Sequence, residues 1–567
     1  MSDPPGSAVS SLSSPGRFLA LLLLCLALFL PGIASLPPTD RDEALYTQAT
    51  RQMLESGNLL DIRFQEQPRY KKPIGIYWLQ ALSAGAARQA GIPATAMAPY
   101  RLVSLLGATA AVLLLYGLFA PLVGTQQAFL AAVLLAGCLL LAVEATLAKT
   151  DATLLATVVA MQGGLARATL GEERLHRGGR ALFWGGLGLG MLIKGPVAPL
   201  VAALTVVTLM ARERSWRLLR QLKPWPWLLL SITLVAPWLI TIQLISSGDF
   251  LQQSLGGDVL PKLLEGHESH GAPPGTYTLL APLLLWPTSL VLLPAAWLGW
   301  RVRRQAEAAG GTLHFAMAWL GPAWLLFELV PTKLPQYTLP LVPALCLLAA
   351  AGMADLPARD RVGRWLTRVV LGVWILGALV LAVAAPLASV WALGRVSLAA
   401  AMVTATCLAL LFGCTRAGLA PGRQLALCLA AAVLLWMLLL QVLAPSLRPL
   451  WPAPQLAAVL AEHGIHDQPV AITGFREPSA VLLLGTATQR TNLDGIGRHL
   501  ADHGEAIAIL PSSALPTLET RFPAGAGRQR LIIGRVQGLN ITKGRPLDLS
   551  VLQQRCLSGS GRSTGSC

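Results

Sequence analysis

The chain has 567 residues, of which 54% are hydrophobic and only 13% charged, and its mean hydropathy is +0.58. This composition excludes a soluble globular protein and indicates an integral membrane protein. The excess of 44 Lys and Arg over 28 Asp and Glu does not indicate nucleic-acid binding, because the basic residues lie mainly between apolar runs, as membrane orientation requires.

Thirteen stretches satisfy the requirement of about 20 apolar residues for a helix that crosses the bilayer. They lie near 17–36, 100–120, 126–145, 152–169, 180–194, 195–211, 225–246, 276–299, 313–331, 334–353, 367–388, 396–414 and 425–445. The basic loops around 174–180, 212–223, 301–304 and 359–368 then all fall on one side of the membrane. This pattern predicts a cytoplasmic N-terminus and an outer C-terminus. The first stretch also has the small-residue exit of a signal peptide, which is the alternative to an anchor.

The first outer loop, residues 37–99, contains two amphipathic stretches, Glu43–Leu54 and Ile74–Ala87, which predict helices lying along the interface as a lid-like platform. On the first helix Asp42 and Tyr46 share one face, and Glu43 points about 100° away. Asp42 is therefore the better candidate for a residue that faces a cavity. The competing interpretation is that these acids only complement the helix dipole.

Basic residues follow in the same loop, in Arg69-Tyr70-Lys71-Lys72-Pro73. Two lysines before an amphipathic helix could donate to an anionic group at headgroup level, or could reach lipid phosphates. Lys149-Thr150-Asp151 stands at the next outer junction, where Asp151 is a functional candidate or a helix cap. Lys194 and Lys333 each interrupt an apolar sequence, so we expect each to face a polar cavity.

The outer loop 247–275 contains Lys262, His267, Glu268 and His270. The spacing of the two histidines allows a divalent metal site with Glu268, although Gly266 and the segment 271–274 favour a solvated loop instead.

From residue 446 onward the pattern changes. An expected helix, Pro454–Glu462, is followed by the short apolar runs Pro469–Thr473, Ala480–Leu484, Ala506–Leu510 and Leu531–Val536. These runs predict a small α/β domain outside the membrane, with a Ser/Gly-rich disordered end at 557–567. Six of the eight cysteines lie in or beside apolar stretches and show no metal-binding spacing, whereas Cys556 and Cys567 could pair in an oxidising compartment.

Five motifs occur in a fixed order: the acidic pair Asp42-Glu43, Lys72-Pro73 with Tyr77-Trp78, Asp151, Lys194-Gly195-Pro196, and Lys333-Leu334-Pro335 with Tyr337. In this order and spacing the chain resembles the C-type membrane glycosyltransferases. Within them it is most similar to the branch related to protein O-mannosyltransferases, and in that branch to the bacterial aminoarabinose transferases of lipid A. The resemblance covers roughly residues 17–350.

The resemblance implies an α-helical polytopic membrane fold, residues 1–445, with a small outer α/β domain, residues 446–567. It implies transfer of 4-amino-4-deoxy-L-arabinose from undecaprenyl phosphate to lipid A phosphates, in the bacterial inner membrane with the site facing the periplasm.

By position, the resemblance makes Asp42 and Asp151 the catalytic acids. It assigns substrate binding to Glu43, Tyr46, Lys72 and Tyr337. From the sequence pattern we also expect Tyr70 and Lys194 to bind substrate, with Lys262 and Lys333 as helpers at the phosphate. If the acceptor is a hydroxyl, Asp42 acts as a general base; if it is a phosphate, the acids orient the sugar or pair with its amino group.

No cofactor is expected to be required, although a divalent metal is an open option. The expected partners are the lipid-linked sugar, lipid A and membrane lipids, and the protein is expected to be a monomer. The alternatives are a protein O-mannosyltransferase-like enzyme, a lipid-linked sugar transporter without chemistry, and a scaffold. No internal repeat supports a transporter, and the candidate residues gather at one membrane face, which favours an enzyme.

Overall fold

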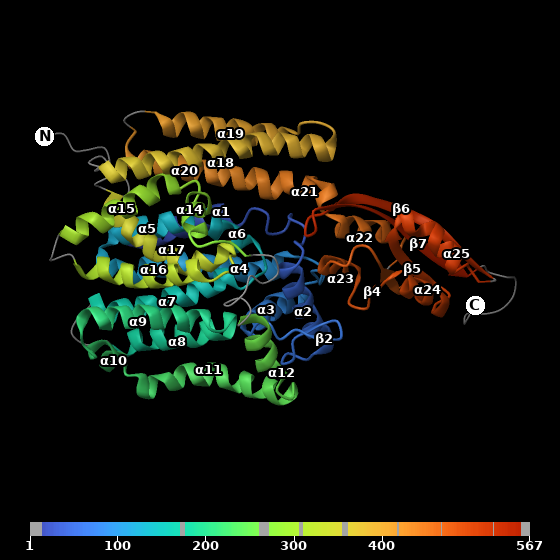
Figure 1. The fold of residues 1–567 in the computed structure, drawn as a ribbon, viewed down its shortest axis with the longest axis horizontal. Coiled ribbons are helices and arrows are strands. Elements are labelled where there is room, and N and C mark those ends of the chain that lie inside the picture. Colours follow the sequence, from blue (N-terminus) through green and yellow to red (C-terminus); the bar gives the residue numbers. More distant parts are fainter. Residues whose placement is uncertain are drawn as a thin grey trace.

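The computed structural model describes residues 14–170, 176–259, 271–305, 310–353, 356, 361–416, 419–465, 468–525 and 527–556. A bundle of apolar helices forms the larger part of the molecule, and a smaller domain with a sheet projects from one end of it (Figure 1). The fold class predicted from the sequence is confirmed.

The helical part begins with α1 and two short helices of the first outer loop, and it continues through a series of long helices. Its elements are α1 (Ser14–Phe29), α2 (Asp42–Ser56), β1 (Arg63–Phe64), β2 (Gln67–Pro68), α3 (Gly75–Gln89), α4 (Ala98–Val123), α5 (Thr125–Ala136), α6 (Leu139–Thr146), α7 (Asp151–Leu170), α8 (Arg177–Lys194), α9 (Val197–Glu213), α10 (Arg217–Leu222), α11 (Pro224–Ile245), α12 (Asp249–Leu251), η1 (Gln252–Val259), α14 (Thr276–Leu284), α15 (Ser289–Gln305), α16 (Gly310–Leu329), η4 (Pro335–Leu341), α17 (Val342–Gly352), α18 (Arg361–Leu393), α19 (Leu398–Thr415), α20 (Pro421–Trp436), η6 (Met437–Leu443), α21 (Ala444–Ser446) and η7 (Arg448–Leu450).

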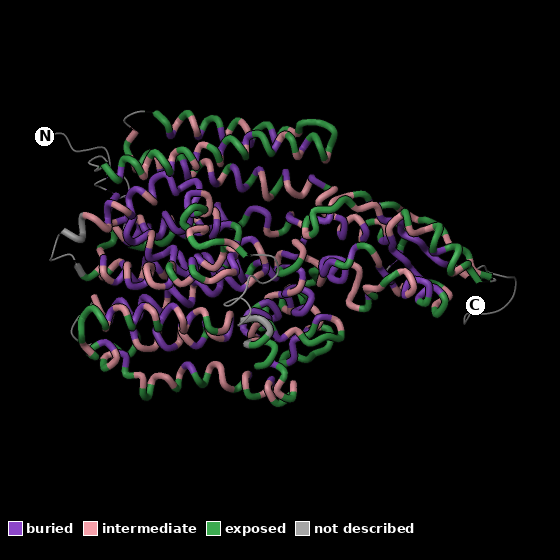
Figure 2. Tube along the Cα trace, in the orientation of Figure 1, coloured by how far each residue is buried: buried purple, intermediate pink, exposed green. Residues whose placement is uncertain are grey.

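Within the described residues, seven segments are long and apolar enough to cross a membrane. They are Ala98–Val123, Asp151–Leu170, Pro224–Ile245, Pro335–Gly352, Arg361–Leu393, Leu398–Thr415 and Pro421–Ser446. The outer helices α18 and α19 expose Leu376, Val383, Leu387 and Phe412, and much of their surface is exposed in Figure 2. Such apolar exposure is stable only against lipid or another apolar surface, so the chain is a multi-pass membrane protein. The count of thirteen spans stays a prediction.

Two stretches expected to be continuous are broken at the same place. The stretch near 126–145 divides into α5 and α6 at Cys138, and the stretch near 276–299 divides into α14 and α15 around Trp286-Pro287. The Leu139 N–H donates to the Trp286 carbonyl at 2.9 Å, and Cys138 pairs with Pro287 as an isolated bridge. Backbone groups that the two breaks leave without a helical partner thus form hydrogen bonds with one another, as their burial requires.

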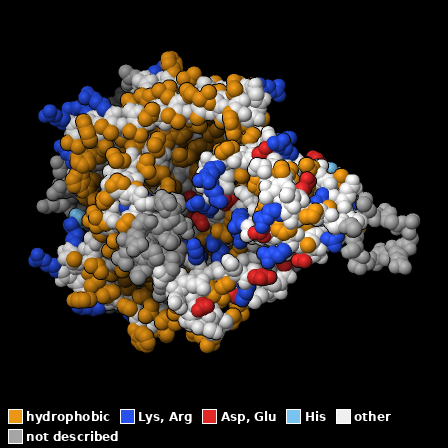
Figure 3. Space-filling view, turned by 45° about the vertical axis from the view of Figure 1, so that its right-hand side comes forward, with side chains coloured by type: hydrophobic (Ala, Val, Ile, Leu, Met, Phe, Trp, Pro, Cys, Tyr) orange, Lys and Arg blue, Asp and Glu red, His pale blue; other side chains and the backbone are white. Residues whose placement is uncertain are grey.

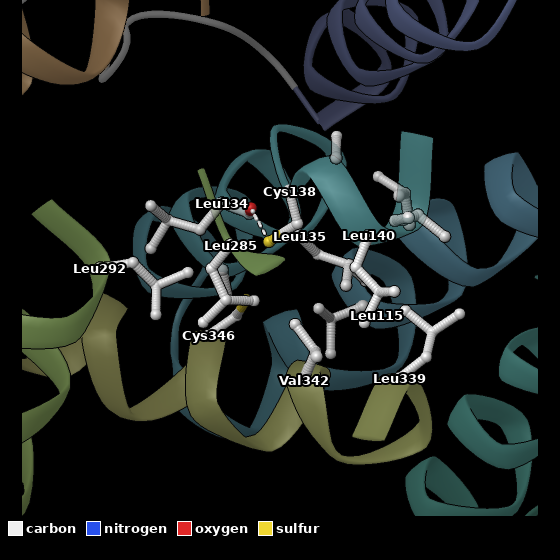
Figure 4. Packing of buried hydrophobic residues seen from close by; sticks show 14 of the residues in the cluster. Leu115, Leu134, Leu135, Cys138, Leu140, Leu285, Leu292, Leu339, Val342 and Cys346 are labelled. Atoms are coloured by element: carbon white, nitrogen blue, oxygen red, sulfur yellow. Dashed lines mark hydrogen bonds between the residues drawn. The ribbon is translucent and has the colours of Figure 1, made fainter. Parts of the chain in front are cut away.

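Apolar side chains fill the space around these breaks. Leu134, Cys138, Leu285, Val342 and Cys346 pack together between α5, α6, α14 and α17, and the Cys138 thiol donates to the Leu134 carbonyl at 3.1 Å (Figure 4). This core keeps the ends of α6 and η4 in fixed positions, and both ends border the site described below.

The C-terminal domain holds a five-stranded mixed sheet in the order β4-β3-β5-β7-β6. Its elements are α22 (Pro452–Glu462), β3 (Val470–Ile472), α23 (Pro478–Leu484), β4 (Gln489–Arg490), α24 (Leu493–Asp502), β5 (Ala506–Pro511), η8 (Ser512–Ala514), α25 (Leu515–Arg521), β6 (Arg528–Asn540) and β7 (Arg545–Cys556). Strands β4, β3 and β5 are parallel, and β7 and β6 join them as an antiparallel hairpin. The apolar run Ala480–Leu484 lies in a helix, because it packs against the first outer loop instead of joining the sheet.

The first outer loop lies between the helical bundle and this domain (Figure 1). Helix α2 contacts α23 through a small apolar cluster of Ala44, Met97 and Leu482. Gly75, the first residue of α3, lies against α8: a Cβ atom there would come within 2.7 Å of the Leu192 carbonyl oxygen. This close approach brings the segment before α3 next to the end of α8 that carries Lys194.

Candidate functional site

A cavity of about 650 Å³ lies where the first outer loop meets the ends of the membrane helices. It is bordered by Thr39, Asp40, Arg41, Asp42, Glu43, Leu45, Tyr46, Arg69, Lys71, Lys72, Leu147, Lys149, Thr150, Asp151, Lys194, Thr332, Leu334, Gln336 and Tyr337. Figure 3 shows Lys, Arg, Asp and Glu side chains gathered in a hollow between the apolar helical surface and the C-terminal domain. The structure thus brings together seven of the predicted residues: Asp42, Glu43, Tyr46, Lys72, Asp151, Lys194 and Tyr337.

Asp42 is the first residue of α2, and its side chain is exposed to the cavity. It makes no hydrogen bond or ion pair with any residue that the structure describes. Tyr46 follows one helical turn later and is 3% exposed. Burial raises the pKa of Tyr46 well above its usual value, and the charges of Tyr77 and Asp42 add to the shift. The Tyr46 hydroxyl therefore stays neutral and forms part of the cavity wall, and the Asp42 carboxylate is available to a substrate.

Glu43 is buried and fully used by the protein itself. Its two oxygens accept from Arg101 Nε at 2.7 Å and Nη2 at 2.9 Å. They also accept from the Thr39 N–H and the Ala148 N–H. Burial alone would raise the pKa of Glu43, but Arg101 and these backbone donors hold it below the usual value. Both oxygens of Glu43 are therefore occupied by protein donors, which leaves none for the predicted contact with a substrate. The arrangement instead supports a structural role, in which Glu43 holds α2 and the segment before α7 in place.

Asp151 opens α7 and forms an ion pair with Lys194 at the end of α8, and both side chains are largely buried. The Lys194 ammonium also lies 5.5 Å from the centre of the Tyr337 ring, within range of a cation–π contact. Three residues from three different elements thus form one connected group on the cavity wall. The two predicted acids differ in state: Asp151 is paired, whereas Asp42 has no partner among the residues that the structure describes.

Further basic residues border the cavity. Arg69 lies 5.1 Å from the centre of the Tyr46 ring, and Lys149 forms an ion pair of 2.9 Å with Glu144. Together with Arg41, Lys71, Lys72 and Lys194, six basic side chains surround the space. Sequence reasoning did not select Arg41, Arg69 or Lys149 as site residues, although Arg69 and Lys149 stand next to the motifs it did select. Such a set is suited to bind anionic groups such as phosphates.

Two predicted substrate-binding residues lie elsewhere. The Tyr70 hydroxyl donates to Asp61 Oδ1 at 2.9 Å, and its ring meets Phe250 edge-on, so Tyr70 belongs to a neighbouring apolar cluster. Lys333 is 8% exposed and donates to the carbonyls of Glu328 and Val330. These are among the last carbonyls of the α16 segment, which a buried lysine can satisfy. Neither Tyr70 nor Lys333 borders the cavity, so the structure does not bring these two predicted residues to the site.

The metal candidates His267, Glu268 and His270, and the helper Lys262, lie outside the described residues. Across the part of the chain that the structure describes, no group of three or more His, Cys, Asp or Glu residues could hold a metal ion. Glu477 of the C-terminal domain does not border the cavity; it is buried and accepts a hydrogen bond from Asn540 Nδ2 at 2.9 Å.

Comparison with known proteins adds independent observations. The family described as dolichyl-phosphate-mannose-protein mannosyltransferase matches residues 71–241. Curated relatives include the undecaprenyl phosphate-alpha-4-amino-4-deoxy-L-arabinose arabinosyl transferases of Erwinia tasmaniensis, 28% identical over 54% of each chain, and of Serratia proteamaculans, 26% identical over 60% of each chain. The chain thus matches only about half to three-fifths of the length of these relatives.

The whole fold matches a solved structure. The crystal structure of ArnT from Cupriavidus metallidurans bound to undecaprenyl phosphate aligns with a TM-score of 0.72 and 16% identity, covering 95% of this chain and 98% of that one. The apo structure of the same protein gives a TM-score of 0.67. The resemblance to C-type membrane glycosyltransferases, predicted from the order of the motifs, is confirmed.

Proposed function

We propose that this chain transfers 4-amino-4-deoxy-L-arabinose from an undecaprenyl phosphate carrier to the phosphate groups of lipid A, on the outer face of the bacterial inner membrane. The observation that carries the proposal is the carboxylate of Asp42, unpaired within the described part of the chain, in a cavity that six basic residues of the outer loop and the helix ends border. The names of the curated relatives supply the donor, and the resemblance of the motif series supplies the acceptor.

The site must bind two anions, the carrier phosphate and the acceptor phosphate, and one cation, the protonated amino group of the sugar. An oxygen of the acceptor phosphate attacks the anomeric carbon of the sugar, the bond from that carbon to the carrier phosphate oxygen breaks, and undecaprenyl phosphate leaves with the electron pair. Lys72 and Arg69 are suited to stabilise the charge on the leaving phosphate. The acceptor phosphate is already ionised, so the step needs no general base. The free carboxylate of Asp42 can instead pair with the protonated amino group of the sugar and orient the ring.

The paired acid has a different part in this proposal. Asp151 is held by Lys194, and Lys194 contacts the Tyr337 ring, so the three residues form a preorganised wall of the cavity. A wall built from three elements fixes the position of a charged group more precisely than a loop alone.

The outward orientation rests on the positions of the basic loops. Helix α8 begins at Arg177 and ends at Lys194 beside the cavity, and α9 runs back from there to Arg212 and Glu213. The basic segments therefore lie at the helix ends opposite to the cavity, and basic segments favour the cytoplasmic side. Cys556 at the end of β7 is disulfide-bonded, which is consistent with an oxidising compartment for the C-terminal domain.

The test in cells is mass spectrometry of lipid A from a strain that lacks the protein, complemented with wild type, Asp42→Asn or Glu66→Gln. Glu66 is an exposed acid in the same loop that does not border the cavity, so it serves as the matched control. We expect wild type and Glu66→Gln to add an aminopentose mass to the lipid A phosphates. Transfer by Asp42→Asn should fall by about 10²- to 10³-fold, since it loses an electrostatic contact to the reacting sugar. Unmodified lipid A in every strain would overturn the proposed acceptor.

The proposed reaction requires no divalent metal, because basic side chains already neutralise both phosphates. Incubation of the purified enzyme with a chelator should leave the transfer rate within about two-fold of the untreated rate. A loss of activity that Mg²⁺ or Zn²⁺ restores would instead direct attention to His267, Glu268 and His270.

One alternative has its own observation. The family that matches residues 71–241 is described as protein mannosyltransferases, whose acceptor is a polypeptide. With a Ser or Thr hydroxyl as acceptor, Asp42 would act as the general base and Asp42→Asn would change the pH dependence of the rate. A phosphate acceptor predicts no such change.

A further inference from the structure

A second cavity, of about 310 Å³, lies on the other side of the segment that precedes α2. It is bordered by Pro38, Thr39, Asp40, Arg41, Leu450, Trp451, Pro452, Ala453, Pro454, Ser479, Ile541 and Thr542. Thr39, Asp40 and Arg41 also border the main cavity, so a wall of three residues is common to the two spaces. Only these three residues therefore separate a ligand in the second cavity from a ligand in the main cavity.

Two of these three residues are held by the protein. The Thr39 hydroxyl donates to Glu43 Oε2 at 2.8 Å. Asp40 accepts from the Ser479 N–H of the C-terminal domain at 3.1 Å. The segment is thus bound both to α2 and to the C-terminal domain, and Arg41 directly follows the two bound residues.

Arg41 is the exception within this wall. Its side chain is exposed, and it makes no hydrogen bond or ion pair with any residue that the structure describes. Its backbone adopts φ 64° and ψ −110°, in a region that side-chain-bearing residues rarely occupy. A glycine would be less strained at this position, so the presence of arginine is unexplained by the local fold. Strain of this kind occurs at ligand-binding positions, where the side chain repays it through a ligand.

The other walls of the second cavity are mainly apolar and lie close to the membrane edge. Leu450 and Trp451 follow α21, where the last segment capable of crossing the membrane ends at Ser446. Ile541, Ala453 and the prolines add to the apolar lining, and Ser479 and Thr542 are the polar residues contributed by the C-terminal domain. A guanidinium beside an apolar, Trp-containing wall at the level of the lipid headgroups fits a phosphate attached to a sugar of a glycolipid.

We propose that Arg41 binds the acceptor phosphate and that the second cavity holds the adjoining sugar of the acceptor glycolipid. This inference rests on the proposed function and assigns its acceptor subsite. Arg69 and Lys72 then serve the leaving carrier phosphate, and Arg41, which borders both cavities, holds the attacking phosphate. The two anions, which repel one another, are thus held by separate cations until the glycosidic bond forms.

The experiment measures initial transfer rates by purified, reconstituted enzyme, with donor and lipid A concentrations varied independently. The variants are Arg41→Gly, which relieves the backbone and removes the guanidinium, and Arg41→Lys, which retains the charge. Thr542→Trp fills the second cavity from the C-terminal domain. Arg448→Gln is the matched control, since Arg448 is exposed, precedes Leu450 by two residues and borders neither cavity.

For Arg41→Gly we expect the KM for lipid A to rise by about ten- to a hundred-fold, because a charge-assisted contact to the acceptor phosphate is lost. The KM for the donor should not change. Arg41→Lys should recover part of this loss, and Thr542→Trp should raise the same KM. Direct binding of lipid A to the donor-free enzyme should weaken in the same order. A rise in donor KM alone, or no change in either KM, overturns the assignment of Arg41. Absence of transfer by wild type would instead overturn the proposed function itself.

Discussion

Two neighbouring acids at the start of α2 have opposite environments. Asp42 is exposed to the cavity and unpaired among the described residues, whereas Glu43 is 1% exposed and bound to Arg101. The helical period places consecutive residues on different faces, so one acid faces the cavity and the other faces the interior. The first is available for chemistry, and the second contributes to the framework that presents it.

Neutralising Glu43 should therefore act on stability. Glu43→Gln leaves the buried Arg101 guanidinium without its charge partner, which costs about 3–5 kcal/mol of the free energy of unfolding. We expect a large drop in the thermal denaturation midpoint in detergent. Asp42→Asn should retain the wild-type midpoint and lose only transfer. Equal midpoints for the two variants would show that the Glu43–Arg101 pair is not a structural requirement.

At the scale of elements, segment 477–490 of the C-terminal domain holds the first outer loop. Arg51 Nη1 donates to the Leu482 carbonyl at 2.6 Å, and Gln48 Nε2 donates to Thr486 Oγ1 at 2.8 Å. Gln65 Nε2 donates a hydrogen bond to the Thr488 carbonyl at 2.7 Å. Together with the Asp40 contact to Ser479, these bonds connect the domain to α2, which carries Asp42, and to the segments before and after that helix.

This docking should weaken as the pH rises from about 4 to 6. Burial raises the pKa of Asp40 to about 6, and the nearby charge of Glu477 also raises it, against the lowering effect of the Ser479 hydrogen bonds. Because the pKa of Asp40 is raised in the docked state, this acid binds its proton more tightly there than in the undocked state. Its contribution to the free energy of docking is therefore fully present at low pH and is lost as the pH passes 6.

The measurement is hydrogen exchange of residues 478–484 at pH 5 and pH 7, corrected for intrinsic rates. Protection should be higher at pH 5 in wild type. Asp40→Asn should remove that difference. Protection that rises with pH would contradict the assigned direction.

The sequence predicted the elements whose patterns are local. The period of α2 distinguished Asp42 from Glu43, and the apolar runs at 470–472 and 506–511 became strands. Residues that lie elsewhere than the sequence led us to expect are placed by contacts that are distant in the chain or specific to a helix end. Lys333 looked like a cavity residue because it interrupts an apolar sequence, but it satisfies carbonyls at the end of α16. Arg41 gave no sequence signal, because its position between two cavities depends on the docking of the C-terminal domain.

At the scale of the whole molecule, the charge distribution and the cavity define the two faces. The ends of α8 and α9 that carry Arg177 and Arg212 lie opposite to the cavity. The free cysteines of the described chain, Cys25, Cys138, Cys346, Cys407, Cys414 and Cys428, are all buried. Single introduced cysteines can therefore report the orientation with little background labelling.

Glu66→Cys, in the first outer loop, should react with a membrane-impermeant maleimide in intact spheroplasts. Arg212→Cys should react only after the membrane is opened. The reverse pattern would place the cavity in the cytoplasm and contradict the proposed orientation.

The central claim is that the cavity joins an aminosugar to a phosphate of a glycolipid. The most direct measurement is transfer of labelled 4-amino-4-deoxy-L-arabinose from undecaprenyl phosphate by the purified protein in vesicles, with lipid A, enzymatically dephosphorylated lipid A or a Ser/Thr-rich polypeptide as acceptor. The account predicts label on phosphorylated lipid A, and none on the other two acceptors. Label on the polypeptide, or equal label on lipid A without phosphates, would contradict it.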